Sequence, residues 1–411
     1  MTSSFCFILL QNLANLKELD LRNSQNLKEL PDLSKATNIE VLCLMRCLSL
    51  NSVHPSVFSL PKLEILNLCG CESLTILATD LHLCRLSYLN LSRCYNLKEF
   101  TLKSDNLKEL RLELTRMKAL PSSLGHQRRL ELLSLGRSLI ERLPAFFSNT
   151  QLLHLDISFC WNLVTIPELP LSLQTLYAAG CESLKTVFFH STAVEQLKEN
   201  RKQVLFFKCR NLDEHSLEAI GLNARINVMK FANQHLSAPK QDDFENYNDY
   251  DKKYESYQAF YGYPGSSVPE WLEFKSKKDY VIIDLSSAPP SPVYGFILGF
   301  VLFEELDKLE FSIAITDCEG KGIFDEVRLK LSYMFWSVKS CEVVVMYDQR
   351  CSNFLNSIAK NLTRFKINVR SNGKYYRAFP SRGFGVSIVR TSSYSSFMQQ
   401  MELGDSMYQF H

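Results

Sequence analysis

The chain has 411 residues, 46% of them apolar and 22% charged, which describes a globular protein with room for two or more hydrophobic cores and excludes a mainly disordered chain. Its 46 basic and 44 acidic residues leave a formal charge of only +2, so the chain as a whole has no electrostatic attraction for nucleic acid or an anionic membrane. No run of 18 apolar residues occurs, and we therefore expect no membrane-spanning helix.

Residues 1–15 form the first predicted segment, a lead-in or cap before the repetitive sequence begins. The apolar run in "SSFCFILL" has no lysine or arginine before it and no small-residue cleavage site after it. A secretory signal peptide carries both features. The run therefore predicts ordinary soluble sequence rather than a signal peptide.

Residues 16–190 repeat the pattern L-x-x-L-x-L-x-x-[N/C] eight times, at intervals of 21 to 24 residues. The copies begin at Leu16, Ile39, Leu63, Leu86, Leu107, Leu130, Leu152 and Leu173. A second apolar pair follows each copy, as Leu74 and Leu77 do in the third. This is the period of leucine-rich repeats, and it predicts an α/β solenoid whose short strands stack into a curved parallel sheet.

Position nine of the copies holds a column of small residues. It is serine or threonine in three copies and cysteine in the others, namely Cys47, Cys71, Cys94, Cys160 and Cys181, and Cys209 continues the column after the last copy. The chain has 13 cysteines, an odd number in a protein too long to need disulfide staples. A buried turn needs a small residue that can still form a hydrogen bond, so we expect these thiols to be structural rather than catalytic or metal-binding.

Positions three, five, seven and eight of each copy point away from the predicted core, toward the concave face of the solenoid. Several of them are arginine or aromatic, the residue types that dominate protein-binding hot spots. The candidate binding residues are Arg46, Tyr88, Arg93, Arg111, Arg137, His154, Asp156, Phe159 and Tyr177. His154 and Asp156 could form an acid–base pair, but no nucleophile motif accompanies them, and a polar contact is the better interpretation. Taken singly, each of these residues could equally belong to the solvated face of a scaffold.

The composition changes three times beyond residue 190. Residues 191–239 have two stretches of helical spacing and one more cysteine turn, which predicts an atypical C-terminal cap of the repeats. Residues 240–262 are acidic and tyrosine-rich and predict a linker. Seven β-rich runs in 263–390 predict an antiparallel, all-β sandwich with no helix-length pattern, and 391–411 predict a flexible tail.

Two stretches carry a family resemblance. "NLANLKELDLRNSQNLKELPDLSKATNIEVLCLMRCLSL" resembles the repeats of plant intracellular immune receptors of the Toll/interleukin-receptor nucleotide-binding leucine-rich-repeat class. "YPGSSVPEWLEFKS", followed by "VIIDL" and "YGFILGFVLF", resembles the start of the C-terminal jelly-roll, Ig-like domain of that class. Its motif residues here are Pro264, Gly265, Pro269 and Trp271. The resemblance implies a repeat solenoid followed by a jelly-roll, Ig-like sandwich.

The resemblance also implies recognition without catalysis. In that family the repeats and the sandwich bind a pathogen effector or a guarded host protein in the cytoplasm or the nucleus. No cofactor, metal, nucleic acid or membrane partner is implied. Oligomerisation would need nucleotide-binding and signalling domains, and the phosphate-cradling motif G-x-x-x-x-G-K-[ST] does not occur in this sequence. Phe384 also departs from the family, which usually has a cysteine before this Gly-Val pair.

Two alternatives from other classes of protein stay open. The repeats could hold a host protein as a scaffold or substrate adaptor in ubiquitin ligation or signalling; a docking helix such as an F-box before the repeats would favour this interpretation, and the sequence has none. A secreted inhibitor of microbial enzymes is a third possibility. The absence of a signal sequence and the unpaired thiols disfavour it.

Overall fold

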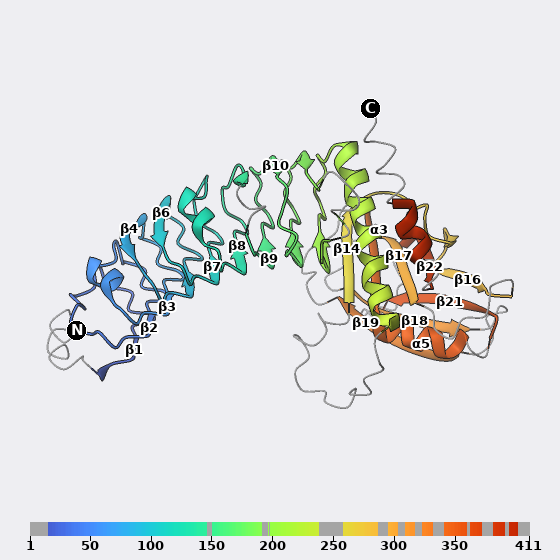
Figure 1. The fold of residues 1–411 in the computed structure, drawn as a ribbon, viewed down its shortest axis with the longest axis horizontal. Coiled ribbons are helices and arrows are strands. Elements are labelled where there is room, and N and C mark those ends of the chain that lie inside the picture. Colours follow the sequence, from blue (N-terminus) through green and yellow to red (C-terminus); the bar gives the residue numbers. More distant parts are fainter. Residues whose placement is uncertain are drawn as a thin grey trace. The chain divides into compact units, whose positions relative to one another are not determined.

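The computed structural model describes residues 15–145, 150–190, 196, 198–237, 258–286, 295–302, 309–316, 323–331, 341–359, 362–371, 381–390 and 394–401. The chain divides into two compact units (Figure 1). The first comprises the chain up to Phe189 together with Cys209–Asp213, and the second comprises His190–Lys208 and the chain from Glu214 onward. Each unit has its own set of fully buried apolar side chains.

One three-residue strand from each predicted copy joins a parallel sheet in the first unit (Figure 1). The strands are β1 (Glu18–Asp20), β2 (Val41–Cys43), β3 (Ile65–Asn67), β5 (Tyr88–Asn90), β7 (Glu109–Arg111), β8 (Leu132–Ser134), β9 (His154–Asp156) and β11 (Thr175–Tyr177). Each pairs in parallel with the next, so that positions three, four and five of one copy lie beside the same positions of its neighbour. The predicted leucine-rich-repeat solenoid is confirmed.

Leucines at positions one, four and six hold each strand in this sheet. In the third copy Leu63, Leu66 and Leu68 are all buried. Burial of one such side chain contributes about 1.5–3 kcal/mol, and a copy cannot bury it without a stacked neighbour. In the first copy, whose strand pairs only with β2 among the residues described, the same positions are only partly buried.

The segments that return from one strand to the next are irregular. They contain β4 (Ile76–His82), β6 (Glu99–Lys103), β10 (Thr165–Ile166), β12 (Thr186–Val187) and the 3-10 helices η2 (Pro55–Ser59) and η3 (Ser122–His126). β4 pairs in parallel with β6, and β10 with β12. The second apolar pair of each copy is buried from the second copy onward, including Leu74 and Leu77. Each return segment therefore closes the core opposite the strand.

Two sheets make up most of the second unit (Figure 1). The first has the order β13 (Gln203–Leu205), β14 (Gln258–Pro264), β20 (Glu342–Asp348), β17 (Gly295–Leu302), β22 (Ser381–Val389) and β15 (Phe274–Ser276). The second has the order β16 (Tyr280–Asp284), β21 (Arg364–Ser371), β18 (Leu309–Thr316) and β19 (Ile323–Leu331). Only β13 and β14 pair in parallel; the other neighbouring strands of these sheets are antiparallel. All seven predicted β-rich runs are strands, and the antiparallel sheets agree with the predicted sandwich.

Two helices that the sequence analysis did not predict accompany these sheets. α5 (Gln349–Ala359) packs against β17, β19 and β20, with Cys351 and Leu355 buried one turn apart. Residues 394–401 are also helical, where a flexible tail was expected over 391–411. Phe397 of this helix is buried, and the Arg225 guanidinium lies 4.7 Å from the centre of its ring. No helix in the described ranges is long and apolar enough to cross a membrane.

The segments between the repeats and the sheets differ from the expected cap and linker. α3 (Glu214–Ser237) lies along β14, β17 and β20 (Figure 1). The expected cap over 191–239 is therefore divided, because Cys209–Asp213 belongs with the repeats and α3 with the second unit. Of the expected linker over 240–262, the part from Gln258 onward is strand β14; residues 238–257 lie outside the described part of the chain.

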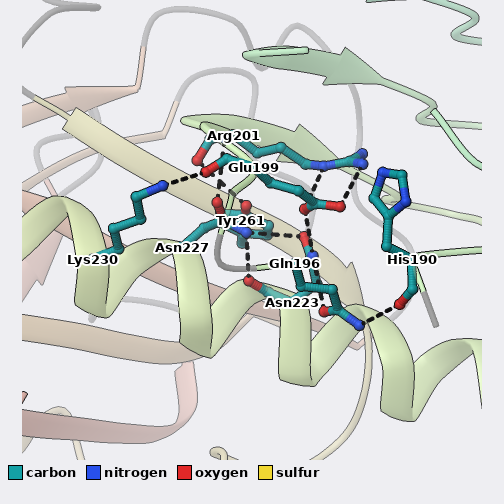
Figure 2. Close-up of polar contacts among 8 residues, drawn as sticks. All are labelled: His190, Gln196, Glu199, Arg201, Asn223, Asn227, Lys230 and Tyr261. Carbon is teal, nitrogen blue, oxygen red and sulfur yellow. Dashed lines mark hydrogen bonds and ion pairs between the residues drawn. The ribbon is translucent and has the colours of Figure 1, made fainter. Parts of the chain in front are cut away.

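A buried polar cluster joins α3 to the segment that precedes it in the second unit (Figure 2). Arg201 donates two hydrogen bonds to the Glu199 carboxylate, at 2.8 and 2.9 Å, and the two side chains are 2% and 0% exposed. From α3, Asn223 donates to Glu199 Oε2 at 2.7 Å and Lys230 donates to the backbone oxygen of Glu199 at 2.6 Å. An ion pair buried this deeply is compatible with folding because its partners and their hydrogen bonds compensate both charges.

Candidate protein-binding face of the repeat array

The residue at position eight of every copy adopts a left-handed backbone conformation. We call these residues the left-handed row: Asn23, Arg46, Gly70, Arg93, Leu114, Arg137, Phe159 and Gly180, with φ between 58° and 75°. Up to the seventh copy, the backbone N–H of each donates to the position-seven carbonyl of the next copy, at 2.7 to 2.9 Å. The sheet ladder thus continues past each strand and ends in a turn that glycine adopts without strain, asparagine with little, and the other residues at a cost of about 1–2 kcal/mol.

Three arginines of the candidate set stand in this row, and all three are exposed. Arg46 and Arg93 make no ion pair within the part of the chain that the structure describes. The Arg137 guanidinium lies 5.3 Å from the centre of the Phe159 ring. Phe159 in turn meets Trp161 edge to face, with ring centres 6.5 Å apart, and Trp161 is 45% exposed. Arg137 and Phe159 of the row, together with Trp161 beside it, therefore place an aromatic pair next to a cation.

Arg111 belongs to a separate group on the strands. Its guanidinium forms ion pairs with the carboxylates of Glu109 and Glu113, the second at 3.7 Å. Glu113 also accepts a hydrogen bond from the Ser92 hydroxyl, and Asn90 donates to the Tyr88 hydroxyl at 3.0 Å. The sequence analysis treated Arg111 as an available cation. The structure shows its charge already compensated by two glutamates, so this patch is acidic on balance.

His154, Asp156 and Tyr177 form a second group on the strand face. His154 and Asp156 lie on the same face of β9, and Tyr177 is the neighbour of Asp156 across the β9–β11 ladder. Asp156 Oδ1 accepts the backbone N–H of Ser158 at 2.9 Å, and burial raises the pKa of its carboxyl. The carboxylate is thus occupied by a turn, which leaves it poorly placed to act as a base toward a ligand.

The cysteine column lies beneath this face. Each thiol of the column donates to the position-six carbonyl of the preceding copy, or its equivalent, at 3.1 to 3.3 Å: Cys47 to Leu21, Cys71 to Leu44, Cys94 to Leu68, Cys160 to Leu135, Cys181 to Ile157 and Cys209 to Ala178. All six are buried, and none of them forms a disulfide bond. Among the described residues no group of histidine, cysteine and carboxylate side chains could hold a metal ion.

The C-terminal motif lies at the end of β14 and just beyond it. Pro264 is the last residue of that strand, and a Cβ on Gly265 would come within 2.6 Å of the Val343 side chain. Leu272 donates its backbone N–H to the Pro269 carbonyl at 3.2 Å. The Trp271 ring faces the Arg225 guanidinium of α3 at 5.7 Å. Each of these contacts is internal to the second unit.

Sequence reasoning missed three features of this face. It did not identify the left-handed conformation at position eight, although glycine in two copies was a signal. It did not single out Trp161, which directly follows the cysteine of the seventh copy. It also assigned position five only to the outward face, whereas Asp20, Asn67, Asn90 and Asp156 all accept a backbone N–H two residues later.

No protein-family profile matches the chain. Disease resistance protein RML1A of Arabidopsis thaliana is 38% identical over 166 residues, which cover 40% of this chain and 14% of that protein. Disease resistance protein RPS4B of the same plant is 32% identical over 269 residues, 64% of this chain and 21% of that protein. The chain spans about a fifth or less of the length of these relatives. Among solved structures, the leucine-rich repeat domain of the type III effector XCV3220 (XopL) matches 44% of this chain and 74% of its own, at 20% identity and a TM-score of 0.28.

Proposed function

Because this chain belongs to the leucine-rich-repeat disease resistance proteins of the Toll/interleukin-receptor class, we propose that its repeat array is a non-catalytic recognition module of a plant immune receptor. The partner in this proposal is a pathogen effector, bound in the cytoplasm or the nucleus through complementary shape and charge. The similarity to the curated relatives supports the receptor class. The side chains of the repeats support the choice of the contact face.

One observation carries the proposal, namely that bulky and charged side chains occupy the left-handed row. Gly70 and Gly180 fill this position without strain and Asn23 with little, whereas arginine, leucine and phenylalanine there cost about 1–2 kcal/mol each. Arg46, Arg93 and Arg137 bear that strain and hold exposed guanidinium groups at the ends of the strands. Arginine and aromatic residues are enriched in binding hot spots. Strain kept at an exposed position supports a role in binding rather than in folding.

The second unit supplies a further contact surface in this proposal. Its resemblance to the C-terminal domain of such receptors supports that role. The motif that carries the resemblance is itself structural, because Trp271 packs on Arg225 and Gly265 leaves room for Val343. The effector contacts of this unit therefore lie on residues outside the motif.

A binding screen with matched charge reversals tests the proposal. The full chain is screened by yeast display against the secreted proteins of plant pathogens, in parallel with Arg93→Glu, Arg137→Glu and the control Arg128→Glu. Arg128 is exposed and precedes β8, whereas Arg137 follows it, so the two arginines of this copy lie at opposite ends of one strand. We expect effectors that bind the unchanged chain and the control but lose about tenfold or more in affinity for the two row variants.

The thermal midpoint of each variant shows whether a loss of affinity reflects lost binding contacts or lost folding. We expect Arg93→Glu to leave it unchanged, because glutamate bears the same left-handed strain as arginine, and Arg137→Glu to lower stability only by about 0.5–1 kcal/mol, the contribution of its contact with the Phe159 ring. A larger fall would make these arginines structural. If the effectors bind all variants with equal affinity, the left-handed row is not part of the binding face. If no pathogen protein binds and the same screen run against host plant proteins finds partners, the scaffold or adaptor function is favoured instead.

A further inference from the structure

The left-handed row has a regular spacing that the backbone imposes. Its N–H groups continue the hydrogen-bonded ladder from copy to copy at 2.7 to 2.9 Å. Neighbouring members are therefore about as far apart as neighbouring strands of a sheet, about 4.8 Å. Side chains of this row therefore project at regular intervals along the end of the sheet, one from each copy.

Cations occupy every second position of this row from the second copy to the sixth. From the second copy to the seventh the row reads arginine, glycine, arginine, leucine, arginine, phenylalanine. Arg46, Arg93 and Arg137 are thus two copies apart, which places their Cα atoms at intervals of about 9.6 Å. Gly70 and Leu114 between them carry no charge. A partner that satisfies all three cations needs carboxylates on one side at the same interval.

The interval discriminates between the regular conformations of a partner. A polyproline II segment has three residues per turn and rises about 3.1 Å per residue, so every third residue faces the same way at intervals of about 9.3 Å. A β-strand repeats its face every second residue, at about 6.6–6.8 Å, and an α-helix repeats each turn at about 5.4 Å. Only the polyproline II segment sets successive same-face carboxylates opposite successive arginines.

The aromatic pair Phe159 and Trp161 fits the same conformation. The Phe159 ring lies across Gly180, where a Cβ would come within 2.5 Å of it, and it carries Arg137 beside it and Trp161 at its edge. Trp161 presents nearly half of its surface to solvent. Exposed aromatic rings are the surfaces on which polyproline II segments dock their prolines. The guanidinium group of arginine, in turn, pairs with a carboxylate through two parallel hydrogen bonds.

We propose that the left-handed row binds an acidic, proline-rich segment of a protein partner in the polyproline II conformation. An aspartate or glutamate at every third residue meets Arg46, Arg93 and Arg137 in turn, and proline rings pack on Phe159 and Trp161. The inference rests on the proposed function, since it takes the repeat array to be a protein-binding face. It adds the chemistry and the conformation of the segment that is bound.

Two synthetic peptides of one composition and different arrangement test the spacing, and a third of opposite charge tests the sign of the charge. The full chain is titrated against fluorescein-labelled peptides with four repeats of Glu-Pro-Pro, with the same residues in one acidic and one proline block, and with four repeats of Lys-Pro-Pro. Fluorescence anisotropy measures each affinity. We expect the Glu-Pro-Pro peptide to bind about tenfold or more tightly than either of the others. Equal affinity for the block peptide would mean charge attraction without register and would overturn the proposal.

Glycine variants locate the binding without disturbing the turn. Arg93→Gly removes the side chain and keeps the left-handed conformation, as Gly70 does in the preceding copy. We expect Arg93→Gly to weaken binding of the Glu-Pro-Pro peptide about tenfold, Trp161→Ala to weaken it as well, and Arg128→Ala to leave it unchanged. Circular dichroism and the thermal midpoint check that each variant is folded.

The outcome separates this inference from the function on which it rests. If Arg93→Gly and Arg128→Ala have equal effects, the peptide does not use the row and the inference fails. If the row variants lose an effector in the display screen while no Glu-Pro-Pro peptide binds, the inference alone fails and the recognition function stands. If the peptide binds with the expected register and no effector depends on the row, the effector-recognition function fails and the row is a site for another acidic partner.

Discussion

At the residue scale, position five of the copies forms a turn as well as part of the exposed face. A side-chain oxygen at this position accepts the backbone N–H two residues later, at 2.9 to 3.0 Å, in Asp20, Asn67, Asn90 and Asp156. Asparagine and aspartate form such turns alike. Asp156 differs because burial raises the pKa of its carboxyl. The fold therefore holds a carboxylate there at the expense of stability near neutral pH.

Replacing Asp156 with asparagine should raise the thermal midpoint at neutral pH. Asparagine keeps the oxygen that accepts from Ser158 and removes the charge that burial penalises. Because the folded-state pKa lies above the unfolded value, the carboxyl favours folding most below the unfolded pKa, and this contribution is lost as the pH rises through the folded pKa. The gain from Asp156→Asn should therefore shrink as the pH falls, which melts between about pH 3 and pH 8 would show.

Alanine at the same position is the matched control. Asp156→Ala also removes the carboxylate but leaves the Ser158 N–H without its acceptor, and it should cost about 1 kcal/mol relative to asparagine. A lower midpoint for Asp156→Asn at neutral pH would show that the attraction between Asp156 and Arg111 outweighs burial.

At the scale of the element, the cysteine column ties the exit of each strand to the strand before it. The thiols donate to carbonyls of the preceding copy, so they extend the links between copies below the sheet. Burial raises the pKa of Cys94 and of Cys160 to about 12. Since the thiolate is the reactive form of cysteine, these side chains should be inert while the repeats stay folded.

Pulse labelling with iodoacetamide should separate the column from the exposed thiols. At about pH 8 we expect Cys84, which is exposed, to be alkylated in the native chain and Cys94 and Cys160 to be protected. Peptide mapping by mass spectrometry measures each site. In urea all three should react at similar rates. Alkylation of native Cys94 as rapid as that of Cys84 would contradict the buried hydrogen bond to Leu68.

The repeats could be predicted because each copy repeats one spacing of apolar residues. Eight matches to the same template are enough to locate the eight strands that the copies contribute to the parallel sheet. The conformation at position eight could not be predicted in the same way. Arginine, leucine and phenylalanine disfavour φ near +60°, so local preference at Arg93 or Phe159 argued against the turn that the ladder imposes. Only Asn23, Gly70 and Gly180 carried a local signal.

At the scale of the whole molecule, the chain contains two units with separate cores. The first depends on stacked leucines and the thiol column, as at Cys94, whose thiol donates to Leu68 at 3.2 Å. The second contains the buried Glu199–Arg201 pair, to which α3 contributes hydrogen bonds. Substitutions in one core should therefore act on one unfolding transition.

Two substitutions test this independence. Cys94→Ala removes one buried hydrogen bond and should lower the stability of the repeats by about 1 kcal/mol. Arg201→Ala leaves the Glu199 carboxylate buried without its cation and should cost the second unit about 3–5 kcal/mol. Differential scanning calorimetry with near-ultraviolet circular dichroism assigns each transition. If both substitutions shift one common transition by their full amounts, the two units unfold together.

Most strands of the second unit could be predicted from the sequence, whereas α5 and the pairing of its distant strands could not. Runs such as "EVVVMY" identified β20, because continuous apolar β-formers leave little choice of structure. β14 was missed in part since its residues Gln258–Pro264 follow an acidic, tyrosine-rich stretch that resembles a linker. α5 has only 11 residues, and the polar Ser352 and Asn356 among its buried positions hide its apolar face. The pairing of Phe384 with Phe300, stacked with centres 5.1 Å apart, depends on register between distant strands and no local pattern shows it.

The backbone hydrogen bonds of the left-handed row determine which substitutions the row tolerates. The bonds from copy to copy at position eight use only the main-chain N–H, so every residue except proline preserves them. Asparagine, arginine, leucine, phenylalanine and glycine already stand there in one framework. New specificities can therefore arise by single replacements at the positions that already carry a side chain, one copy at a time, whereas a side chain at Gly180 would meet the Phe159 ring.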